Sequence, residues 1–386
     1  MGKDTEIVSM KKICFFVNSG WYFELHWLER AIALKNNNNE VHIVSHFSNA
    51  EIQRLKSLGF YCHETDMHER SLRIIDGFVD LSNSVAILKK INPDIIHAIT
   101  IKPILIGGLF CRLKCKCFIA SFVGLGRVFM SHSLLYKLIR KIVTITYKII
   151  FKNSKSLLLF EHSSDKKLLT NLIGISPTKC IVINGSGVNI EEFNYAYEKD
   201  TIKPSVLFAS RMIWSKGLGD LVKIKKEIDL DIDIDFDLNV AGIYIEDDAD
   251  SIPLEVIHAW SNDGLINWLG KIDNVSSLIE KNSIVVLPST YYEGIPRILI
   301  ESAAKGRPII AYDIGGCRNI IKNGITGFLI KKGDVSELKD KITFLLSDVN
   351  LRRKMGEHGR KLVEEKFCSD IIVKETIQIY VKVLTL

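Results

Sequence analysis

The sequence predicts an α/β protein made of two doubly wound, Rossmann-like domains that face a central cleft. Short apolar segments alternate with helix-length segments along the whole chain, which is the pattern of open parallel sheets covered by helices. The chain of 386 residues is also longer than one core usually serves, because single cores stop growing at about 250–300 residues. Both observations favour two domains of similar size.

The predicted strands fall into two series of six. Each segment is short and rich in Ile, Val, Leu and Phe, as buried strands of parallel sheets are. In the first half the segments are 13–18, 40–45, 94–99, 117–122, 156–161 and 180–185. In the second half they are 204–210, 236–242, 266–270, 283–289, 307–313 and 326–330. The similar spacing of the two series predicts one sheet for each half.

A charged stretch near 190–203, followed by Pro204, is predicted to link the two domains. We therefore expect the first domain over 1–195 and the second over 196–370. The last segment, 371–386, has apolar residues at helical spacing and no strand after it. It is predicted to be a helix that crosses back to the first domain.

The composition is that of a folded protein, with 47% apolar and 25% charged residues. The eight cysteines are irregularly spaced in a long chain, so reduced thiols in the cytoplasm are expected rather than disulfides. The cysteine-rich segment 111–117 contains no C-x-x-C pair, and no metal site is predicted.

The distribution of charge is more informative than its net value of +6. No acidic residue occurs between Asp94 and Glu161, whereas eleven Lys and Arg residues do. Within this region, segment 127–156 mixes large apolar residues with regularly spaced bases, so it is too charged to span a bilayer. A basic amphipathic surface that contacts anionic headgroups is one interpretation, and a half-buried helix with solvated lysines is the other. Nucleic acid is not expected, because the aromatic residues are not interleaved with the bases.

Two cations follow the first predicted strand of the second half. Arg211 and Lys216 stand in the loop between the strand 204–210 and a helix that begins near Gly217. Open α/β sheets bind ligands at this carboxyl edge, and an Arg with a Lys suits a diphosphate. Cations are common in loops, so the prediction of a ligand site depends on the residues of the next loop as well.

The stretch 291–313 adds two acids at the next predicted loop. Glu293 stands in the loop after the strand 283–289, and Pro296 suits the first position of a helix. Glu301 follows about five residues into that helix, roughly 7 Å along its axis. The backbone N–H groups of 294–297 are expected to point toward the same site, where they suit an anion or sugar hydroxyls. The two acids and two cations together predict a binding site for a nucleotide-sugar.

These residues resemble the retaining nucleotide-sugar glycosyltransferases of family 4, whose architecture is the two-domain GT-B fold. The similarity includes Arg211 with Lys216-Gly217, Glu293-Gly294-Ile295-Pro296 with Glu301, and the segment "NGITGFLI" at 323–330. The resemblance implies catalytic roles for Arg211, Lys216 and Glu293. It implies donor binding by Glu301, Gly294, Ile295, Pro296, Arg297 and Gly20. It also implies that no metal or other cofactor is required.

The first half is expected to bind the acceptor. His26 lies on the helix after the Ser19–Gly20 turn, and Gly124 and Gly126 lie in a later loop. Both regions are similar to a subgroup that extends sugars on polyprenyl diphosphate. His97 at the end of the strand 94–99 is assigned to the same site by position, and a core histidine is the alternative.

The resemblance implies transfer of an N-acetylhexosamine, GalNAc or GlcNAc, from UDP onto an undecaprenyl-diphosphate-linked sugar in O-antigen or surface polysaccharide biosynthesis. The protein would then be cytoplasmic and peripheral on the cytoplasmic face of the inner membrane, contacting it through segment 127–156. The alternatives are a UDP-sugar epimerase on the same architecture and a non-catalytic protein that uses the basic segment. A nicotinamide dehydrogenase is disfavoured, because no G-x-G-x-x-G follows the first strand.

Overall fold

The computed structural model describes residues 10–67, 74–131, 133–200, 203–230, 234–246, 248–291 and 294–386, and it leaves out the side chains of 74–80 and 127. The chain forms two compact units. Unit 1 comprises Met1–Ser186 and Ile372–Leu386, and unit 2 comprises Gly187–Ile371. Each unit contains one parallel sheet with helices, which confirms the α/β fold class with two doubly wound domains.

Unit 1 contains a parallel sheet of seven strands in the order β3-β2-β1-β4-β5-β6-β7. The strands are β1 (Lys12–Ser19), β2 (Glu40–His46), β3 (Tyr61–Glu64), β4 (Ile95–Ile99), β5 (Cys117–Phe122), β6 (Ser156–Phe160) and β7 (Cys180–Val182). The strand order reverses between β1 and β4. Open α/β sheets bind ligands beside the carboxyl ends of strands at such a reversal.

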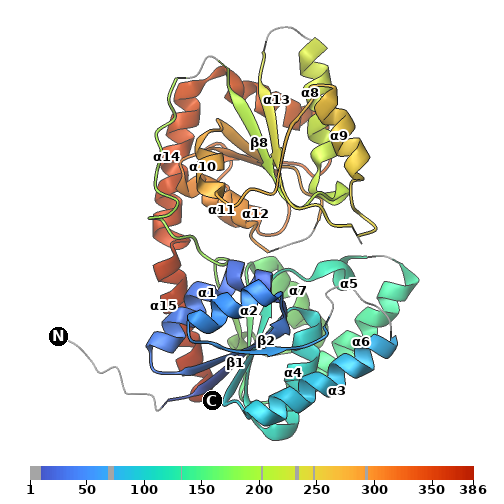
Figure 1. Ribbon diagram of the computed structural model, residues 1–386. Helices are drawn as coiled ribbons and strands as arrows, with labels where there is room; N and C mark the ends of the chain where they lie inside the picture. The colour runs from blue at the N-terminus through green and yellow to red at the C-terminus, as the bar shows by residue number, and fades with distance from the viewer. Residues whose placement is uncertain are drawn as a thin grey trace, which may run out of the picture. The chain divides into compact units, whose positions relative to one another are not determined.

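Helices cover both faces of the unit 1 sheet (Figure 1). Consecutive side chains of β1 point to opposite faces, so Phe15 packs in one buried cluster and Phe16 in the other. The Phe15 face is covered by α1 (Gly20–Asn36), α2 (Asn49–Ser57) and α15 (Ser369–Leu384). The Phe16 face is covered by α3 (Ile74–Ile91), α4 (Ile101–Lys114), α5 (Gly126–Met130), α6 (Leu134–Ile150) and α7 (Ser163–Ile173), and the turn η1 (Pro177–Lys179) precedes β7.

The edge strand β3 was not predicted from the sequence. It contains four residues, Tyr61–Glu64, of which His63 and Glu64 are polar. Because the strand pairs with β2 alone and is incompletely buried, it lacks the continuous apolar run of a central parallel strand.

Unit 2 contains a parallel sheet of six strands in the order β10-β9-β8-β11-β12-β13. The strands are β8 (Ser205–Ala209), β9 (Asp237–Ala241), β10 (Asn267–Gly270), β11 (Ile284–Leu287), β12 (Ile309–Tyr312) and β13 (Gly327–Ile330). The helical segments are η2 (Trp214–Lys216), α8 (Leu218–Leu230), α9 (Leu254–Asn262), α10 (Val275–Glu280), α11 (Arg297–Ala304), α12 (Cys317–Ile320), α13 (Val335–Ser347) and α14 (Val349–Lys366). The order reverses between β8 and β11, so the ends of these two strands are the expected ligand edge.

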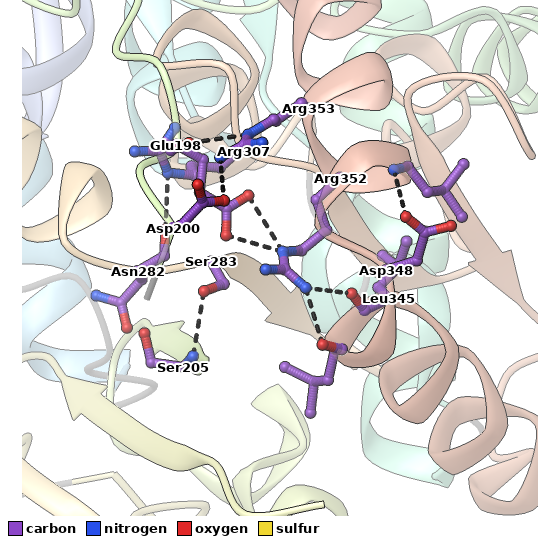
Figure 2. Close-up of polar contacts among 12 residues, drawn as sticks. Glu198, Asp200, Ser205, Asn282, Ser283, Arg307, Leu345, Asp348, Arg352 and Arg353 are labelled. Atoms are coloured by element: carbon purple, nitrogen blue, oxygen red, sulfur yellow. Dashed lines mark hydrogen bonds and ion pairs between the residues drawn. The ribbon is translucent and has the colours of Figure 1, made fainter. Parts of the chain in front are cut away.

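The stretch that the sequence predicts as a linker is hydrogen-bonded to unit 2 in its described part (Figure 2). Arg352 on α14 donates from Nε to both carboxylate oxygens of Glu198, at 2.8 and 3.1 Å, and both side chains are buried. Arg307 donates from Nη1 to the carbonyl of Ala196 at 2.6 Å. Loss of either partner would leave the other charge buried and uncompensated, which is strongly destabilising. Glu198 is therefore part of the unit 2 structure.

Among the described residues, no helix combines the length and the apolar character that crossing a bilayer requires.

Candidate active site

The loop after β8 is anchored by backbone hydrogen bonds at the carboxyl edge of the unit 2 sheet. The backbone N–H of Met212 donates to the carbonyl of Ile243 at 3.0 Å, and the N–H of Trp214 donates to the carbonyl of Asp250 at 2.8 Å. Arg211 precedes these anchors, and Lys216 ends the 3-10 turn η2. Both cations therefore stand where the sequence predicts them, on a loop that backbone hydrogen bonds tie to its neighbours.

Gly217 brings this loop against the end of the neighbouring strand. Its φ is +88°, in the left-handed region that favours glycine. A Cβ at this position would lie 2.1 Å from the carbonyl oxygen of Pro288, which follows β11. The N–H groups of Thr290 and Tyr291 then donate to the carbonyl of Ser215 at 2.7 and 3.2 Å. The loops after β8 and β11 form one hydrogen-bonded unit.

Arg211 and Lys216 converge on a single aromatic ring. The Arg211 Cζ and the Lys216 Nζ each lie 5.7 Å from the centroid of the Tyr291 ring. Both distances are within the range of cation–π attraction. Lys216 is 5% exposed, so its charge lies in an environment that screens it poorly. The structure thus brings together the two cations that the sequence assigns to a diphosphate.

Tyr291 was missed by the sequence analysis as a site residue, although it stands in the stretch 291–313 that drew attention to the acids. Its aromatic side chain two residues before Glu293 was the available signal. Glu293 itself lies outside the described residues, so its predicted role stays a prediction.

The segment after Glu293 packs against the loop that follows β12. A Cβ on Gly316 would lie 2.5 Å from the carbonyl oxygen of Gly294 and 2.7 Å from the Cα of Ile295. Ile295 is buried, and Pro296 is the N-cap of α11. The helix begins at Arg297, one residue later than predicted. The loops after β8, β11 and β12 therefore lie together at one edge of the sheet.

Glu301 is buried on α11 and pairs with Arg297 one turn earlier. The Arg297 Nε donates to Glu301 Oε1, and Glu301 is 6% exposed. Burial raises the pKa of the Glu301 carboxyl above its ordinary value, and the Arg297 guanidinium opposes that shift. Among the described residues, this is the ion pair that Glu301 forms, and it does not pair with Arg211 or Lys216. A buried acid at a ligand edge is a candidate functional group.

Three predicted residues of unit 1 lie at the carboxyl edge of its sheet. Gly20 is the first residue of α1, and a Cβ there would lie 2.5 Å from Phe47 Cδ1. Gly124 and Gly126 follow β5 with φ of +99° and +63°. These conformations explain the glycines without a ligand, and their predicted roles in binding stay predictions.

His26 and His97 differ sharply in their surroundings. His26 is partly buried on α1, with its ring centroid 4.3 Å from that of Tyr22. His97 is fully buried on β4, where its ring nitrogens bond Tyr380 Oη at 2.6 Å and Ser121 Oγ at 2.7 Å. The assignment of His97 to the acceptor is wrong, because a side chain with no exposed surface and two occupied nitrogens cannot contact a substrate. It is a core histidine, and burial keeps its pKa well below the ordinary value.

Two buried polar atoms at the unit 1 edge have no hydrogen-bond partner among the described residues. They are Asn18 Oδ1 near the end of β1 and Thr100 Oγ1 after β4, and Thr100 has a φ of +73°. Unsatisfied groups and positive φ concentrate at functional edges. Over the described residues, no cluster of three His, Cys, Asp or Glu side chains is placed to hold a metal.

Comparison with known proteins defines the class. Residues 189–362 match the family described as "Glycosyl transferases group 1", and residues 12–159 match "Glycosyl transferase 4-like". Together the two matches take in most of both units. The protein is therefore a glycosyltransferase, whose second half matches the group 1 family that the sequence motifs predict.

Three relatives illustrate the range of similarity. An N,N'-diacetylbacillosaminyl-diphospho-undecaprenol alpha-1,3-N-acetylgalactosaminyltransferase of Campylobacter jejuni is 26% identical over 91% of this chain and 93% of its own. A UDP-Gal:alpha-D-GlcNAc-diphosphoundecaprenol alpha-1,3-galactosyltransferase of Escherichia coli is 25% identical over 72% of this chain and 73% of its own. The crystal structure of a glycosyltransferase from Rickettsia africae has a TM-score of 0.77, at 22% identity over 97% of this chain and 99% of the other. That structural likeness supports the two-domain GT-B fold.

Proposed function

We propose that this protein is a retaining glycosyltransferase that moves an N-acetylhexosamine from UDP onto an undecaprenyl-diphosphate-linked sugar during O-antigen or surface polysaccharide assembly. The convergence of Arg211 and Lys216 on Tyr291 is the observation that carries the proposal. The acceptor class is supported by the relatives from Campylobacter jejuni and Escherichia coli, whose names specify undecaprenyl-diphosphate-linked acceptors.

The two cations would stabilise the leaving diphosphate. Negative charge grows on the departing phosphate oxygen as the glycosidic bond breaks, so fixed cations act more strongly on the transition state than on the bound donor. Lys216 is well suited to this task because its charge is buried and its loop is anchored before the reaction starts. Losing one such group costs roughly 3–4 kcal/mol in activation free energy.

The acids would hold the two ends of the donor. We assign Glu301 to the ribose hydroxyls, because a buried carboxylate can accept hydrogen bonds from both. The pairing with Arg297 favours the ionised form that this role requires. Glu293 is assigned to the donor sugar. No side chain is nominated as a general base, because on a same-face path the leaving phosphate can take the acceptor proton.

The reaction would occur at the cytoplasmic face of the inner membrane, where a polyprenyl acceptor remains embedded. The basic composition of segment 127–156 supports this location. His26, Gly124 and Gly126 stay the candidates for acceptor binding on unit 1.

The proposal is tested by donor turnover in membranes that contain the lipid-linked acceptor. We expect Lys216→Ala to lower transfer from labelled UDP-N-acetylhexosamine by a factor of hundreds, and Glu293→Ala to lower it strongly. The control is Lys223→Ala, which removes an exposed lysine from α8 of the same unit. Near-normal transfer in both site variants would contradict the proposal. Formation of the epimeric UDP-sugar without acceptor would identify an epimerase instead.

A further inference from the structure

Helix α6 uses only one of its faces to pack against unit 1. Val143, Tyr147 and Ile150 are buried in the cluster on the Phe16 side of the sheet. Arg140 fastens the first half of the helix by donating from Nε to the carbonyl of Val128 at 2.8 Å. The helix is thus held firmly, and its opposite face is available for another role.

That opposite face is apolar and exposed. Six large side chains lie on it: Leu134 (83% exposed), Leu135 (58%), Leu138 (59%), Ile142 (58%), Ile145 (51%) and Ile149 (47%). At about 100° per residue they occupy an arc of roughly 100°, away from Val143 and Tyr147. We call these six residues the α6 stripe. A contiguous apolar surface of this kind marks an interaction site rather than scattered exposure.

A row of lysines borders the stripe on one side. Lys137, Lys141 and Lys148 are all exposed, and their spacing places them along one margin of the helix. No acidic residue occurs from 95 to 160, so no carboxylate of that segment offsets their charge. The surface is therefore both apolar and positively charged.

We infer that α6 lies flat on an anionic lipid bilayer, with the α6 stripe in the headgroup and acyl boundary and the lysine row against the lipid phosphates. An amphipathic helix with an apolar face and flanking lysines binds such surfaces through buried area plus electrostatic attraction. A second copy of the chain is a poorer occupant. It would bring another lysine row and no carboxylate from the same segment, so the charges would not be complementary.

This inference rests on the membrane location given in the proposed function and names the surface that makes the contact. Its test is separate from the proposed reaction, because lipid binding requires neither donor nor acceptor. Its experimental measure is flotation of the full-length protein with vesicles of phosphatidylcholine, with and without phosphatidylglycerol. We expect the protein to float with the anionic vesicles, to float weakly with the neutral ones, and to be released by high salt.

The contribution of the stripe is tested with Leu138→Glu/Ile142→Glu. Both side chains are exposed, so the substitutions leave the buried face of α6 intact, and unchanged thermal unfolding verifies the fold. We expect flotation to fall to background, because two carboxylates enter the apolar contact. The control is Leu230→Glu, the same change at a residue that is 80% exposed on unit 2, which should float like the unaltered protein.

The contribution of the lysine row is tested with Lys137→Gln/Lys141→Gln/Lys148→Gln. Each lysine near an anionic surface changes partitioning about fivefold, so we expect about a 100-fold loss on anionic vesicles and little change on neutral ones. The control removes the same charge from exposed lysines of unit 2, with Lys223→Gln/Lys226→Gln/Lys361→Gln.

Equal flotation of both α6 variants and the unaltered protein would overturn the inference, as would failure of the unaltered protein to bind anionic vesicles. A lipid-free dimer that Leu138→Glu/Ile142→Glu converts to a monomer would also overturn it, because the stripe would then bind a second copy.

Discussion

Burial and Arg297 act in opposite directions on the Glu301 carboxyl. The pKa is raised in the folded protein because desolvation outweighs the attraction of the guanidinium. The stabilising contribution of this group is therefore fully present below its ordinary pKa of 4.5 and is lost as pH rises through the raised value. Donor binding should have the opposite pH dependence and improve as pH rises through the pKa of Glu301, because accepting hydrogen bonds from the ribose hydroxyls requires the ionised carboxylate.

The pairing of Arg297 with Glu301 predicts how the acidic limb of the pH–rate profile responds to substitution. Arg297→Ala removes the group that lowers the Glu301 pKa, so the acidic limb of kcat/KM should move to higher pH. Glu301→Gln should remove that limb and lower kcat/KM by about 10- to 100-fold, the value of a hydrogen bond to a charged group. The control is Arg54→Ala, which removes an exposed guanidinium paired with Glu24 in unit 1. An unshifted acidic limb in Arg297→Ala would argue against Glu301 as the group that titrates.

Among the secondary-structure elements, the contact between the loops after β8 and β11 determines where Arg211 and Lys216 lie. The loop after β8 reaches the end of β11 because Gly217 has no Cβ, and the hydrogen bonds to Ser215 then fix Tyr291. Arg211 and Lys216 meet the ring of Tyr291 only because these two loops are joined.

Gly217→Ala should separate the two loops. Its φ of +88° costs an alanine about 1–2 kcal/mol, and the contact with the Pro288 carbonyl oxygen at 2.1 Å forces the backbones apart. We expect UDP binding, measured by calorimetry, to weaken at least tenfold. Gly219→Ala is the matched control, since its Cβ would approach nothing closer than Trp214 at 3.6 Å and it lies in α8. Equal UDP affinity in the two variants would show that the loop contact does not position the site.

At the scale of the whole molecule, the chain leaves unit 1 after Ser186 and returns to it at Ile372. The returning helix α15 buries Ile372, Ile379, Tyr380 and Val383 in the same cluster as Phe15. Unit 1 is therefore built from two separate stretches of the chain, whereas unit 2 is continuous.

Deleting 372–386 should unfold unit 1 selectively. Each lost side chain contributes about 1.5–3 kcal/mol of burial, and four of them approach the total stability of a typical domain. Hydrogen exchange should show loss of protection in β1 and β4 and retained protection in β8 and β11. Deleting only 385–386, which are exposed, is the control. Retained protection in β1 after the longer deletion would contradict this account of unit 1.

Sequence patterns were enough to predict the fold class, the positions of twelve strands, the loop that carries Arg211 and Lys216, and the helix that carries Glu301. These features depend on local periodicity and on the rule that ligands bind at the carboxyl edge of parallel strands. The predicted roles of His26, Gly124 and Glu293 remain predictions.

The contacts that these side chains make could not be predicted from the sequence. One ring nitrogen of His97 is occupied by Tyr380, which lies 283 positions away, and no local pattern carries that information. Tyr291 receives both cations because two loops touch through a glycine, and the edge strand β3 forms because β2 offers it a partner. In each case the deciding contact joins residues distant in sequence, and such contacts are set by packing rather than by periodicity.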